Sequence, residues 1–517
     1  MEIRLSLLIL LIVPSALAMK VLLIPAQVPS HLLYFTPLGE ELLEQGHQVG
    51  LVVSPHLLNR VPKGSKGSSM TTHIIPTNKT DKEITEVLIE LGQIQAKGKS
   101  LLKILPLMKA FIDVTSETVC ALLDNEGAVE SLKKEKYDIA VVDGTPFLDS
   151  LYIIPYMLDI PFCSLATANF NYLMGAPALP SFVPSTGTLY TDRMTFLQRI
   201  SNFLATIIGE QILTNSLDEA AGNALIKKYA PNRPAIYLEL KRKTLLWMIN
   251  QDNLLEFHVP LMENAIQVGG LSIMPNKPLP SELEDFITKT NSNVILVSFG
   301  SKSDILDPEM IAKLIFVFKA VKESVIWKYD GYFSDLPSRI KILKWIPQND
   351  VLAHPKVKLF MTHCGNNGQY EALYNGVPML GLPLFADQPH NAIRMQSKGY
   401  GIAMNVHDLT ADQLLHNINE ILANSTYRDN IQKASKIFRS RKSPRKRAFE
   451  ALEHVAMFGG EHLRPSSVDM PFWQLWMIDI YVFLILIMSV ILVILKNVIL
   501  FVCRFVKSRF MTKRKVD

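Results

Sequence analysis

The stretch Lys358-Leu-Phe-Met-Thr-His-Cys-Gly-Asn-Asn-Gly-Gln-Tyr-Glu371 decides the fold of this chain, because a strand pattern passes into a helix pattern within it. Leu359 to Thr362 is a short apolar run of the kind that forms a buried strand. A turn-rich loop follows, and Gln369 to Tyr374 then predicts a helix. A second buried strand is predicted at Pro378 to Leu382. A strand, a loop, a helix and a strand in this order indicate one unit of a parallel sheet.

The ends of the predicted helix carry start and stop signals. Asn367 is available as its N-cap, and Asn375-Gly376 is placed to end it. In such a unit the free N–H groups of the helix start face the crevice beyond the carboxyl end of the strand. The sequence therefore predicts that a diphosphate binds beside this helix start.

Residues suited to a nucleoside lie around the same unit. Trp345 offers a flat face on which a base can stack, and Gln348 carries a donor and an acceptor for a base edge. Glu371 can accept hydrogen bonds from two ribose hydroxyls. The simpler alternatives are a core tryptophan and a solvated helix glutamate. Taken together, with this order and spacing, these residues favour a nucleotide site.

Further polar residues lie where they can bind the diphosphate and the sugar of a nucleotide sugar. His363 and Asn367 can bond phosphate oxygens beside the helix start. Asp387 and Gln388 follow the second strand, where they can read sugar hydroxyls. The predicted ligand is therefore a nucleotide sugar.

These residues resemble the donor-site signature of the UDP-glycosyltransferases, the membrane-anchored UDP-glucuronosyltransferase and UDP-glucosyltransferase group, and the resemblance runs over essentially the whole chain. It implies that a UDP-sugar is the co-substrate. The implied donor-binding residues are Trp345 and Gln348 for uracil, Glu371 for ribose, Ser301, His363, Asn367 and Gly368 with Gly365 for the diphosphate, and Asp387 and Gln388 for the sugar. Cys364 stands where animal members often have glycine and plant members often have cysteine.

The opening of the chain shows a similar pattern. Lys20 to Pro25 predicts a strand, Phe35 to Gln45 a helix and Val49 to Val53 a second strand, and this pattern repeats in outline after Asn293. Each half is therefore expected to build a mostly parallel sheet with helices on both faces, which makes the fold class α/β. The resemblance implies two Rossmann-like doubly wound domains facing across a cleft, the GT-B arrangement, plus one C-terminal transmembrane helix.

The sequence also gives expected segment boundaries. They are a signal peptide over 1–18, an N-terminal acceptor-binding domain over 19–270, a linker over 271–284, a C-terminal UDP-sugar-binding domain over 285–465, a transmembrane region over 477–503 and a cytosolic basic tail over 504–517. Beyond about residue 440, the resemblance implies that helices cross back to the first half.

Both ends of the chain predict the same membrane topology. Met1 to Ala18 has the basic start, apolar run and Ala-Leu-Ala ending of a cleavable secretory signal. The apolar run from Met477 passes the roughly 20 residues that a spanning helix needs, and the basic residues after it place the tail in the cytosol. We expect a single-pass protein of the endoplasmic reticulum membrane with lumenal domains. Lys513 and Lys515 resemble a lysine-based retrieval signal, although a stop-transfer cluster fits them nearly as well.

The distribution of charge argues against a nucleic-acid partner. The chain carries a formal net charge of +5, and from Lys496 onward seven basic residues and one acidic residue give +6, so the remainder is close to −1. The basic run Lys433 to Arg447 is assigned to a solvated helix face.

Four cysteines are too few for a disulfide scaffold in 517 residues. Cys120 and Cys163 are the two that could pair in the lumen, and the sequence leaves their pairing open. Sequons at Asn78 and Asn424 are compatible with lumenal glycosylation, which also stays open.

Sugar transfer from UDP requires a base for the acceptor hydroxyl. His31 is predicted in the loop after the first strand, and a histidine with an unperturbed pKa of about 6.5 can act as a free base. Asp143 ends the strand Ile139 to Val142, where its carboxylate could orient His31. The resemblance assigns both residues these catalytic roles; the alternatives are a capping histidine and a turn-forming aspartate. His47 is expected only to end a helix.

No Asp-x-Asp pair occurs in the sequence, so we expect a metal-independent reaction, and no other cofactor is expected. We expect inversion, because the acceptor oxygen should attack the anomeric carbon from the face opposite UDP. Glucuronosyl-transferring relatives commonly show a Phe-Pro-Arg-Pro-like segment whose arginine is a candidate for meeting the sugar carboxylate. This chain has Phe257-His258-Val259-Pro260 instead. The loss of a charge-assisted contact favours glucose or another neutral hexose, and glucuronate stays open.

The expected acceptor is a small lipophilic alcohol or phenol, because the region from Thr80 to Tyr190 is rich in apolar residues. Core packing explains the same residues equally simply, so the natural acceptor stays open. The alternative function is a catalytically silent lumenal protein that binds UDP-sugars or accompanies other transferases. A single-anchor membrane receptor is a second alternative, and whether the chain forms a homo-oligomer is also open.

Overall fold

The computed structural model describes residues 18–62, 69–77, 86, 90, 101–167, 173–233, 237–300, 306–406 and 408–513. Ser301, Asn78, the expected signal peptide up to residue 17, the end of the tail and parts of the expected acceptor region lie outside the described residues. The chain divides into two compact units, Met1–Arg464 and Pro465–Asp517, and each is described by itself.

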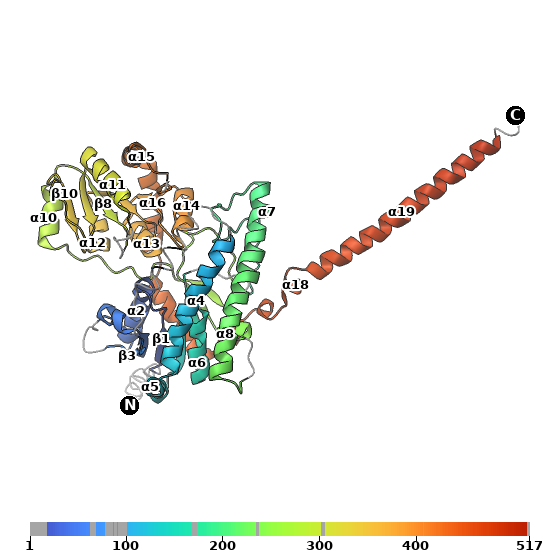
Figure 1. Cartoon of the computed structure of the whole chain (residues 1–517), viewed down its shortest axis with the longest axis horizontal. Helices are drawn as coiled ribbons and strands as arrows, with labels where there is room; N and C mark the ends of the chain where they lie inside the picture. The colour runs from blue at the N-terminus through green and yellow to red at the C-terminus, as the bar shows by residue number, and fades with distance from the viewer. Residues whose placement is uncertain are drawn as a thin grey trace, which may run out of the picture. The chain divides into compact units, whose positions relative to one another are not determined.

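A parallel sheet forms the N-terminal half of the first unit (Figure 1). Its strands are β1 (Lys20–Ile24), β2 (Gln48–Val53), β3 (Thr71–Ile74), β4 (Ile139–Asp143), β5 (Phe162–Ala166), β6 (Trp247–Ile249) and β7 (Ala265–Gln267). They lie in the order β3-β2-β1-β4-β5-β6-β7, and all pair in parallel. Val21 and Leu23 of β1 enter one apolar core and Leu22 and Ile24 the other. A strand buried on both faces is a continuous apolar run, as this one is.

Helices cover both faces of this sheet. They are α2 (Pro29–Glu44), α4 (Leu101–Leu123), α5 (Glu126–Glu135), α6 (Ile153–Leu158), α7 (Phe196–Leu204), α8 (Asn215–Tyr229) and α9 (Tyr237–Arg242), with the short 3-10 helices η1 (Pro55–Arg60) and η3 (Asp149–Tyr152) and the π-helical segment η4 (Ala205–Thr214). Helix α4 packs against α8.

The C-terminal half repeats the architecture with its own parallel sheet. Its strands are β8 (Val294–Ser298), β9 (Ser324–Lys328), β10 (Ile340–Leu343), β11 (Val357–Thr362), β12 (Met379–Gly381) and β13 (Gly401–Ala403). They lie in the order β10-β9-β8-β11-β12-β13. Its helices are α10 (Ser281–Lys289), α11 (Pro308–Ala320), α12 (Gln348–Ala353), α13 (Asn366–Asn375), α14 (Gln388–Ser397), α15 (Ala411–Ala423) and α16 (Ser425–Arg439). The predicted α/β class with two doubly wound halves is confirmed.

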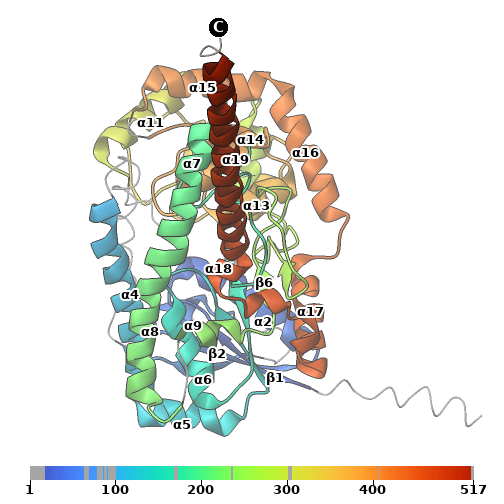
Figure 2. The same ribbon diagram turned by 90° about the vertical axis from the view of Figure 1, so that its right-hand side faces the viewer.

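Helix α17 (Pro444–Phe458) follows the C-terminal half in the chain but packs on the N-terminal core. Its Phe449, Leu452 and Val455 join the apolar cluster that contains Val21 and Leu23 of β1. Figure 2 shows α17 beside α2 and β1. The chain therefore returns to its first half before the second unit begins.

Helix α2 begins earlier than the sequence predicts. It starts at Pro29 rather than Phe35, and proline suits a first turn because its missing N–H has no helical partner there. His31 therefore lies in the first turn of a helix, so its expected place in a loop is wrong.

Helix α13 begins at Asn366 with Gly365 as N-cap, so the expected N-cap role of Asn367 is wrong. Its expected end is confirmed, because Gly376 is the C-cap with a φ of 68°, in the left-handed region that favours glycine. The N-cap of the helix is thus two residues closer to β11 than predicted, at position 365 instead of 367, and the free N–H groups of the helix start move with it.

The basic run Lys433 to Arg447 is not uniformly solvated, so that expectation is wrong in part. Arg441 donates to both carboxylate oxygens of Asp252, at 3.2 and 3.0 Å, and Asp252 is fully buried. Arg445 lies 3.6 Å from the Glu40 carboxylate. These arginines meet acidic residues of the N-terminal half because the chain crosses between the halves here.

All four cysteines are free thiols, so the pairing of Cys120 with Cys163 that the sequence left open does not occur in this structure. Cys163 is buried in β5, and burial raises the pKa of its thiol to about 12.

His47 does more than end a helix, because its Nδ1 accepts a hydrogen bond from the N–H of Met19 at 3.1 Å.

The second unit contains α18 (Phe472–Leu475) and α19 (Ile478–Lys513). Within the part of the chain that the structure describes, Ile478–Lys507 is the one helical segment long and apolar enough to cross a membrane. It starts one residue later than the expected segment 477–503 and extends beyond it. The unit fits a membrane anchor.

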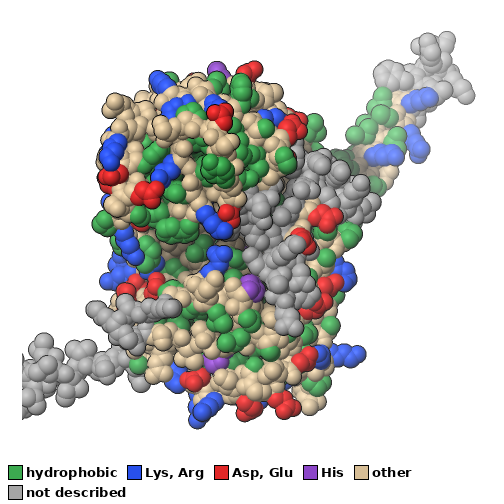
Figure 3. Space-filling model, turned by 60° about the vertical axis from the view of Figure 1, so that its left-hand side comes forward, with side chains coloured by type: hydrophobic (Ala, Val, Ile, Leu, Met, Phe, Trp, Pro, Cys, Tyr) green, Lys and Arg blue, Asp and Glu red, His purple; other side chains and the backbone are tan. Residues whose placement is uncertain are grey.

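Charged side chains are mixed on the surface of the chain. On the face drawn in Figure 3, basic and acidic side chains are interspersed, with no single-sign field over the described atoms. On this face of the described residues, a polyanion would meet no continuous basic surface.

Candidate active site

His31 and Asp143 come together at the carboxyl ends of β1 and β4. His31 Nδ1 lies 2.6 Å from Asp143 Oδ2, and the two side chains are 16% and 0% exposed. Because β1 and β4 are neighbouring parallel strands, the residues that follow one strand meet the end of the other. The structure thus brings the two predicted residues into direct contact.

Asp143 is held as a carboxylate although it is buried. It accepts hydrogen bonds from the N–H groups of Ala26 and Thr145, both at 3.1 Å. Burial alone raises the pKa of Asp143, but the charge of His31 and the hydrogen bonds outweigh it, and the net pKa lies below the ordinary value. An ionised Asp143 favours the His31 tautomer that carries its proton on Nδ1.

Tyr34 is a third member of this cluster that sequence reasoning missed. Its hydroxyl lies 2.5 Å from His31 Nδ1 and donates to Asp143 Oδ2 at 3.2 Å. Burial, and next the charge of Asp143, raise the pKa of Tyr34 well above its ordinary value, so the phenol stays neutral. Residues three apart on a helix share a face, so a helix predicted to start at Pro29 would have placed Tyr34 beside His31.

The start of α13 faces the start of α2. Asn367 Nδ2 donates to the carbonyl oxygen of Ser30 at 3.3 Å, and Ser272 Oγ donates to Asn367 Oδ1 at 3.1 Å. Gly368 lies in the first turn, where an added Cβ would stand 3.4 Å from Gln348 Nε2. The helix start predicted to bind a diphosphate therefore lies beside the residue that precedes His31.

His363 is enclosed between two glycines. A Cβ on Gly365 would lie 2.5 Å from His363 Nε2, and one on Gly300 would lie 2.9 Å from it. Gly300 also has a φ of +83°, where side chains are disfavoured. Burial lowers the pKa of His363 to about 4, so the ring is neutral at neutral pH. It can therefore give a diphosphate a hydrogen bond, as expected of it, but no positive charge.

Trp345 is 68% exposed, so the alternative of a core tryptophan is wrong. Gln348 begins α12, and its Nε2 donates to the Glu371 carboxylate. Burial raises the pKa of Glu371 to about 7, while the hydrogen bond from Gln348 and the charge of Lys328 act in the opposite direction. Glu371 is therefore not a solvated helix charge, and an aromatic face, an amide and a carboxylate are available for a nucleoside.

Lys328 is a cation of this site that sequence reasoning missed. Its charge lowers the pKa of both Glu371 and His363, so it lies near the two side chains. Burial lowers the pKa of Lys328, and the charge of Glu371 opposes this effect. It is the last residue of β9, which pairs with β8. A lysine at the carboxyl end of a central strand was the signal that could have found it.

Asp387 connects the two halves electrostatically. It is the residue before α14, and Asn391 Nδ2 donates to its Oδ2 at 2.6 Å. Although Asp387 is exposed to solvent, desolvation by the surrounding protein raises its pKa, whereas this hydrogen bond and the charge of His31 lower it. The imidazole and the carboxylate are therefore near enough to feel one another across the boundary between the halves.

Gln388 is tied to its own turn. Its Oε1 accepts hydrogen bonds from the N–H groups of Leu384 and Phe385, at 2.8 and 3.1 Å. The acceptor atom of the side chain thus holds the loop after β12 in shape. Only the amide nitrogen is left for the sugar contact that was expected of Gln388.

Cys364 has a φ of +64°, a left-handed conformation that favours glycine. A glycine would adopt this backbone conformation more readily than the cysteine does. The cysteine is buried, and an added Cβ on Gly381 would lie 2.5 Å from its Sγ. Burial raises the pKa of the Cys364 thiol to about 12, which leaves it unreactive at neutral pH.

Ser301 lies outside the described residues. No group of three or more His, Cys, Asp or Glu side chains within the described ranges is placed to hold a metal ion.

Two facing Rossmann-like halves, with a helix-start site in one and a histidine–carboxylate pair in the other, define the GT-B class of glycosyltransferases. Solved structures share the fold. The calicheamicin glycosyltransferase CalG4 matches with a TM-score of 0.60 and 19% identity, covering 86% of this chain and 99% of that chain. The spinosyn rhamnosyltransferase SpnG complexed with thymidine diphosphate matches with a TM-score of 0.59 and 15% identity, covering 84% of this chain and 100% of that chain.

The model of the family described as UDP-glucoronosyl and UDP-glucosyl transferase matches residues 19–515. The chain belongs to this family and is a UDP-glycosyltransferase, which confirms the resemblance seen in the sequence.

Curated relatives extend over nearly the whole chain. UDP-glucuronosyltransferase 2C1 of Oryctolagus cuniculus is 30% identical over 508 residues, covering 94% of this chain and 99% of the relative. UDP-glucuronosyltransferase 2B7 of Homo sapiens is 29% identical over 510 residues, covering 94% of each. UDP-glucuronosyltransferase 3A2 of Homo sapiens is 30% identical over 503 residues, covering 93% of this chain and 94% of the relative.

Proposed function

We propose that this UDP-glycosyltransferase moves a hexosyl or glucuronosyl group from a UDP-sugar to a hydroxyl of a small lipophilic acceptor, with inversion at the anomeric carbon. The observation that carries the proposal is the 2.6 Å contact between His31 Nδ1 and buried Asp143, with Asp387 of the other half within electrostatic reach. A base in one half then meets the donor sugar held by the other.

His31 is the general base and Asp143 its orienting partner. Because Nδ1 faces Asp143, Nε2 is the nitrogen that takes the proton of the acceptor hydroxyl. The acceptor oxygen forms a bond to the anomeric carbon as the bond from that carbon to the diphosphate oxygen breaks, and UDP leaves. Asp143 stabilises the imidazolium that results. Attack from the face opposite UDP converts an α-linked donor into a β-glycoside.

The leaving diphosphate is stabilised without a metal ion. The free N–H groups at the start of α13 point to it, Asn367 and His363 donate hydrogen bonds, and Lys328 supplies a positive charge nearby. Turnover should therefore survive EDTA. Activity that EDTA abolishes and Mn²⁺ restores would contradict this part of the proposal.

The donor sugar is a choice between a neutral hexose and glucuronate. Phe257 is buried and packs edge-on against His390, with ring centroids 5.8 Å apart, in the segment where glucuronosyl-transferring relatives commonly carry an arginine. Without that cation a neutral hexose is favoured, although the curated relatives named above are called glucuronosyltransferases.

The acceptor site belongs to the N-terminal half, and the C-terminal helix anchors the enzyme in the endoplasmic reticulum membrane with both halves in the lumen. The basic residues from Lys496 to Lys515, most of them in the C-terminal part of α19, support this orientation. Disulfide bonds add no argument for a lumenal location, because the described cysteine thiols are unpaired.

The test is turnover with radiolabelled UDP-glucose and UDP-glucuronate side by side, offered with a panel of phenols and alcohols. We expect one β-linked product that disappears in the His31→Ala variant while UDP binding persists. Product formation unaffected by His31→Ala, or an α-linked product, would refute His31 as the base.

A further inference from the structure

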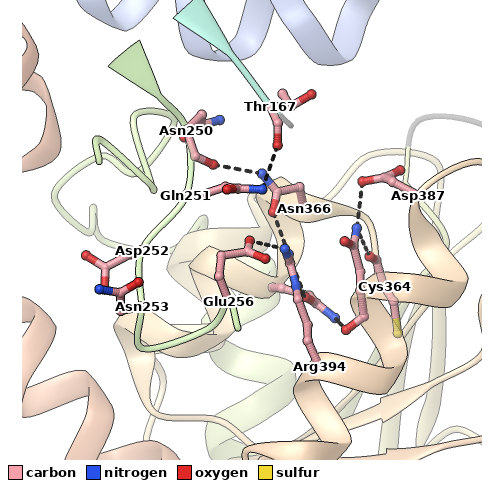
Figure 4. Close-up of polar contacts among 12 residues, drawn as sticks. Thr167, Asn250, Gln251, Asp252, Asn253, Glu256, Cys364, Asn366, Asp387 and Arg394 are labelled. Atoms are coloured by element: carbon pink, nitrogen blue, oxygen red, sulfur yellow. Dashed lines mark hydrogen bonds and ion pairs between the residues drawn. The ribbon is translucent and has the colours of Figure 1, made fainter. Parts of the chain in front are cut away.

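A buried ion pair joins the segment that follows β6 to helix α14. Glu256 and Arg394 are 4% and 2% exposed, and Arg394 Nη1 donates to Glu256 Oε1. The two residues are 138 positions apart in the chain, and Figure 4 shows them meeting where the N-terminal half reaches the C-terminal one. The pair therefore links the two halves directly.

The remaining N–H groups of the guanidinium point to α13. Arg394 Nη2 donates to Asn366 Oδ1 at 2.6 Å, and Nε and Nη2 donate to Gln369 Oε1 at 3.3 and 3.1 Å. Asn366 is the first residue of α13, and its own Nδ2 donates to the carbonyl oxygen of Asn250 at 3.3 Å. One guanidinium thus fixes the helix start at which the diphosphate is proposed to bind.

The network continues to the candidate sugar-reading carboxylate. Gln369 Nε2 donates to the carbonyl oxygen of Asn391 at 3.0 Å. Asn391 Nδ2 in turn donates to Asp387 Oδ2 at 2.6 Å and to the carbonyl oxygen of Cys364 at 3.0 Å. Cys364 follows His363 in the donor loop. An unbroken set of contacts therefore runs from Glu256 to Asp387 and to the donor loop.

Stability alone does not explain this arrangement. A buried ion pair is often no more stabilising than apolar residues of similar volume, because both ions lose their hydration. What a guanidinium adds is a planar set of donors in fixed directions. Burial lowers the pKa of Arg394 to about 9, which is still above neutral pH, so the side chain remains a cation.

We propose that Arg394, held by Glu256, is a positioning residue for the donor: it sets the start of α13 toward the diphosphate and, through Gln369 and Asn391, the Asp387 carboxylate toward the transferred sugar. This inference rests on the proposed function, because that function assigns the donor to α13 and Asp387. Glu256 and Arg394, which are not among the donor-site residues predicted from the sequence, would then align the donor sugar with His31.

Three variants separate positioning from stability. Arg394→Met leaves Glu256 as an unpaired buried charge and should lower the melting temperature. Glu256→Leu combined with Arg394→Met removes both charges and should restore most of that temperature. Arg394→Lys keeps the charge but loses the fork of donors.

We expect the double variant and Arg394→Lys to keep kcat/KM for the UDP-sugar about tenfold to a hundredfold below wild type, because small displacements of a bound reactant are costly. The KM for the acceptor should stay unchanged, and the Kd for UDP should rise. A double variant that recovers both the melting temperature and the wild-type kcat/KM would refute positioning and leave a structural role only.

The matched control is a second buried ion pair in the N-terminal half. Lys241 Nζ donates to Asp149 Oδ2, and their side chains are 3% and 2% exposed. Asp149→Leu with Lys241→Met should alter the melting temperature without altering the donor KM. A wild-type chain that binds no UDP would overturn the proposed function and this inference together, whereas wild-type binding with unaffected variants overturns the inference alone.

Discussion

At the scale of single residues, the imidazole of His31 depends on a carboxylate that is fully buried. Asp143→Asn preserves the shape of that group but removes its charge, and its amide can present an N–H to Nδ1. We expect kcat to fall on the order of 10²–10⁴-fold, because the tautomer and the imidazolium lose their stabilisation. The Kd for UDP should not change, since the donor residues lie in the other half. Steady-state kinetics and calorimetric titration measure the two quantities.

Tyr34→Phe is the matched control for Asp143→Asn. It keeps the buried ring and removes one hydrogen bond to the same carboxylate. The expected loss of kcat is about tenfold or less, the value of a single hydrogen bond. Asp143→Asn with wild-type kcat would contradict the orienting role.

Glu371 gives UDP binding a dependence on pH. Burial raises its pKa to about 7, so the side chain is protonated below that value and loses acceptor capacity for ribose hydroxyls. We therefore expect the affinity for UDP to fall as the pH decreases from about 8 to about 6. Isothermal titration across this range measures the effect. The profile of Glu371→Gln should be flat, and an equally steep profile in that variant would assign the pH dependence to another group.

At the scale of elements, α17 follows the C-terminal half in the chain but packs on the core of the N-terminal half. Leu452 is fully buried in the N-terminal core cluster. Leu452→Ala should lower the free energy of unfolding by about 2–5 kcal/mol, through lost apolar burial and the cavity left behind. Chemical denaturation of the chain without its membrane helix measures the change.

An exposed position on the same helix provides the control. Met457 is 55% exposed, so Met457→Ala should alter the free energy of unfolding by about 0.5 kcal/mol or less. Equal effects of the two substitutions would show that α17 does not dock on the N-terminal core.

At the scale of the whole molecule, the chain separates after Arg464 into a unit that carries the site and a unit that fits a membrane anchor. A chain that ends at Arg464 should keep the wild-type Kd for UDP, because every candidate donor residue precedes that point. It should also leave the membrane fraction in carbonate extraction. Retention in the membrane fraction would show that the first unit holds a further membrane contact.

The residues of the candidate donor site could be ordered from the sequence because they are close together in the chain. From Trp345 to Gln388 the side chains lie along successive strands, loops and helices, so apolar runs and turn residues were enough to order them. The predicted helix starts, Phe35 and Gln369, fall six and three residues after the observed starts at Pro29 and Asn366, because terminal turns depend on caps that sequence patterns resolve poorly.

The α/β class, the family and the apolar C-terminal segment follow from the sequence alone, because strand and helix periodicities and turn chemistry are local properties. The folded chain was needed to show that Tyr34 joins His31 and Asp143, that Lys328 lies near Glu371, and that Arg394 meets Glu256. Parallel sheets bring the ends of strands together whatever the length of chain between them. His31 and Asp143 are 112 positions apart and Glu256 and Arg394 are 138 positions apart, and no local pattern encodes contacts over such separations.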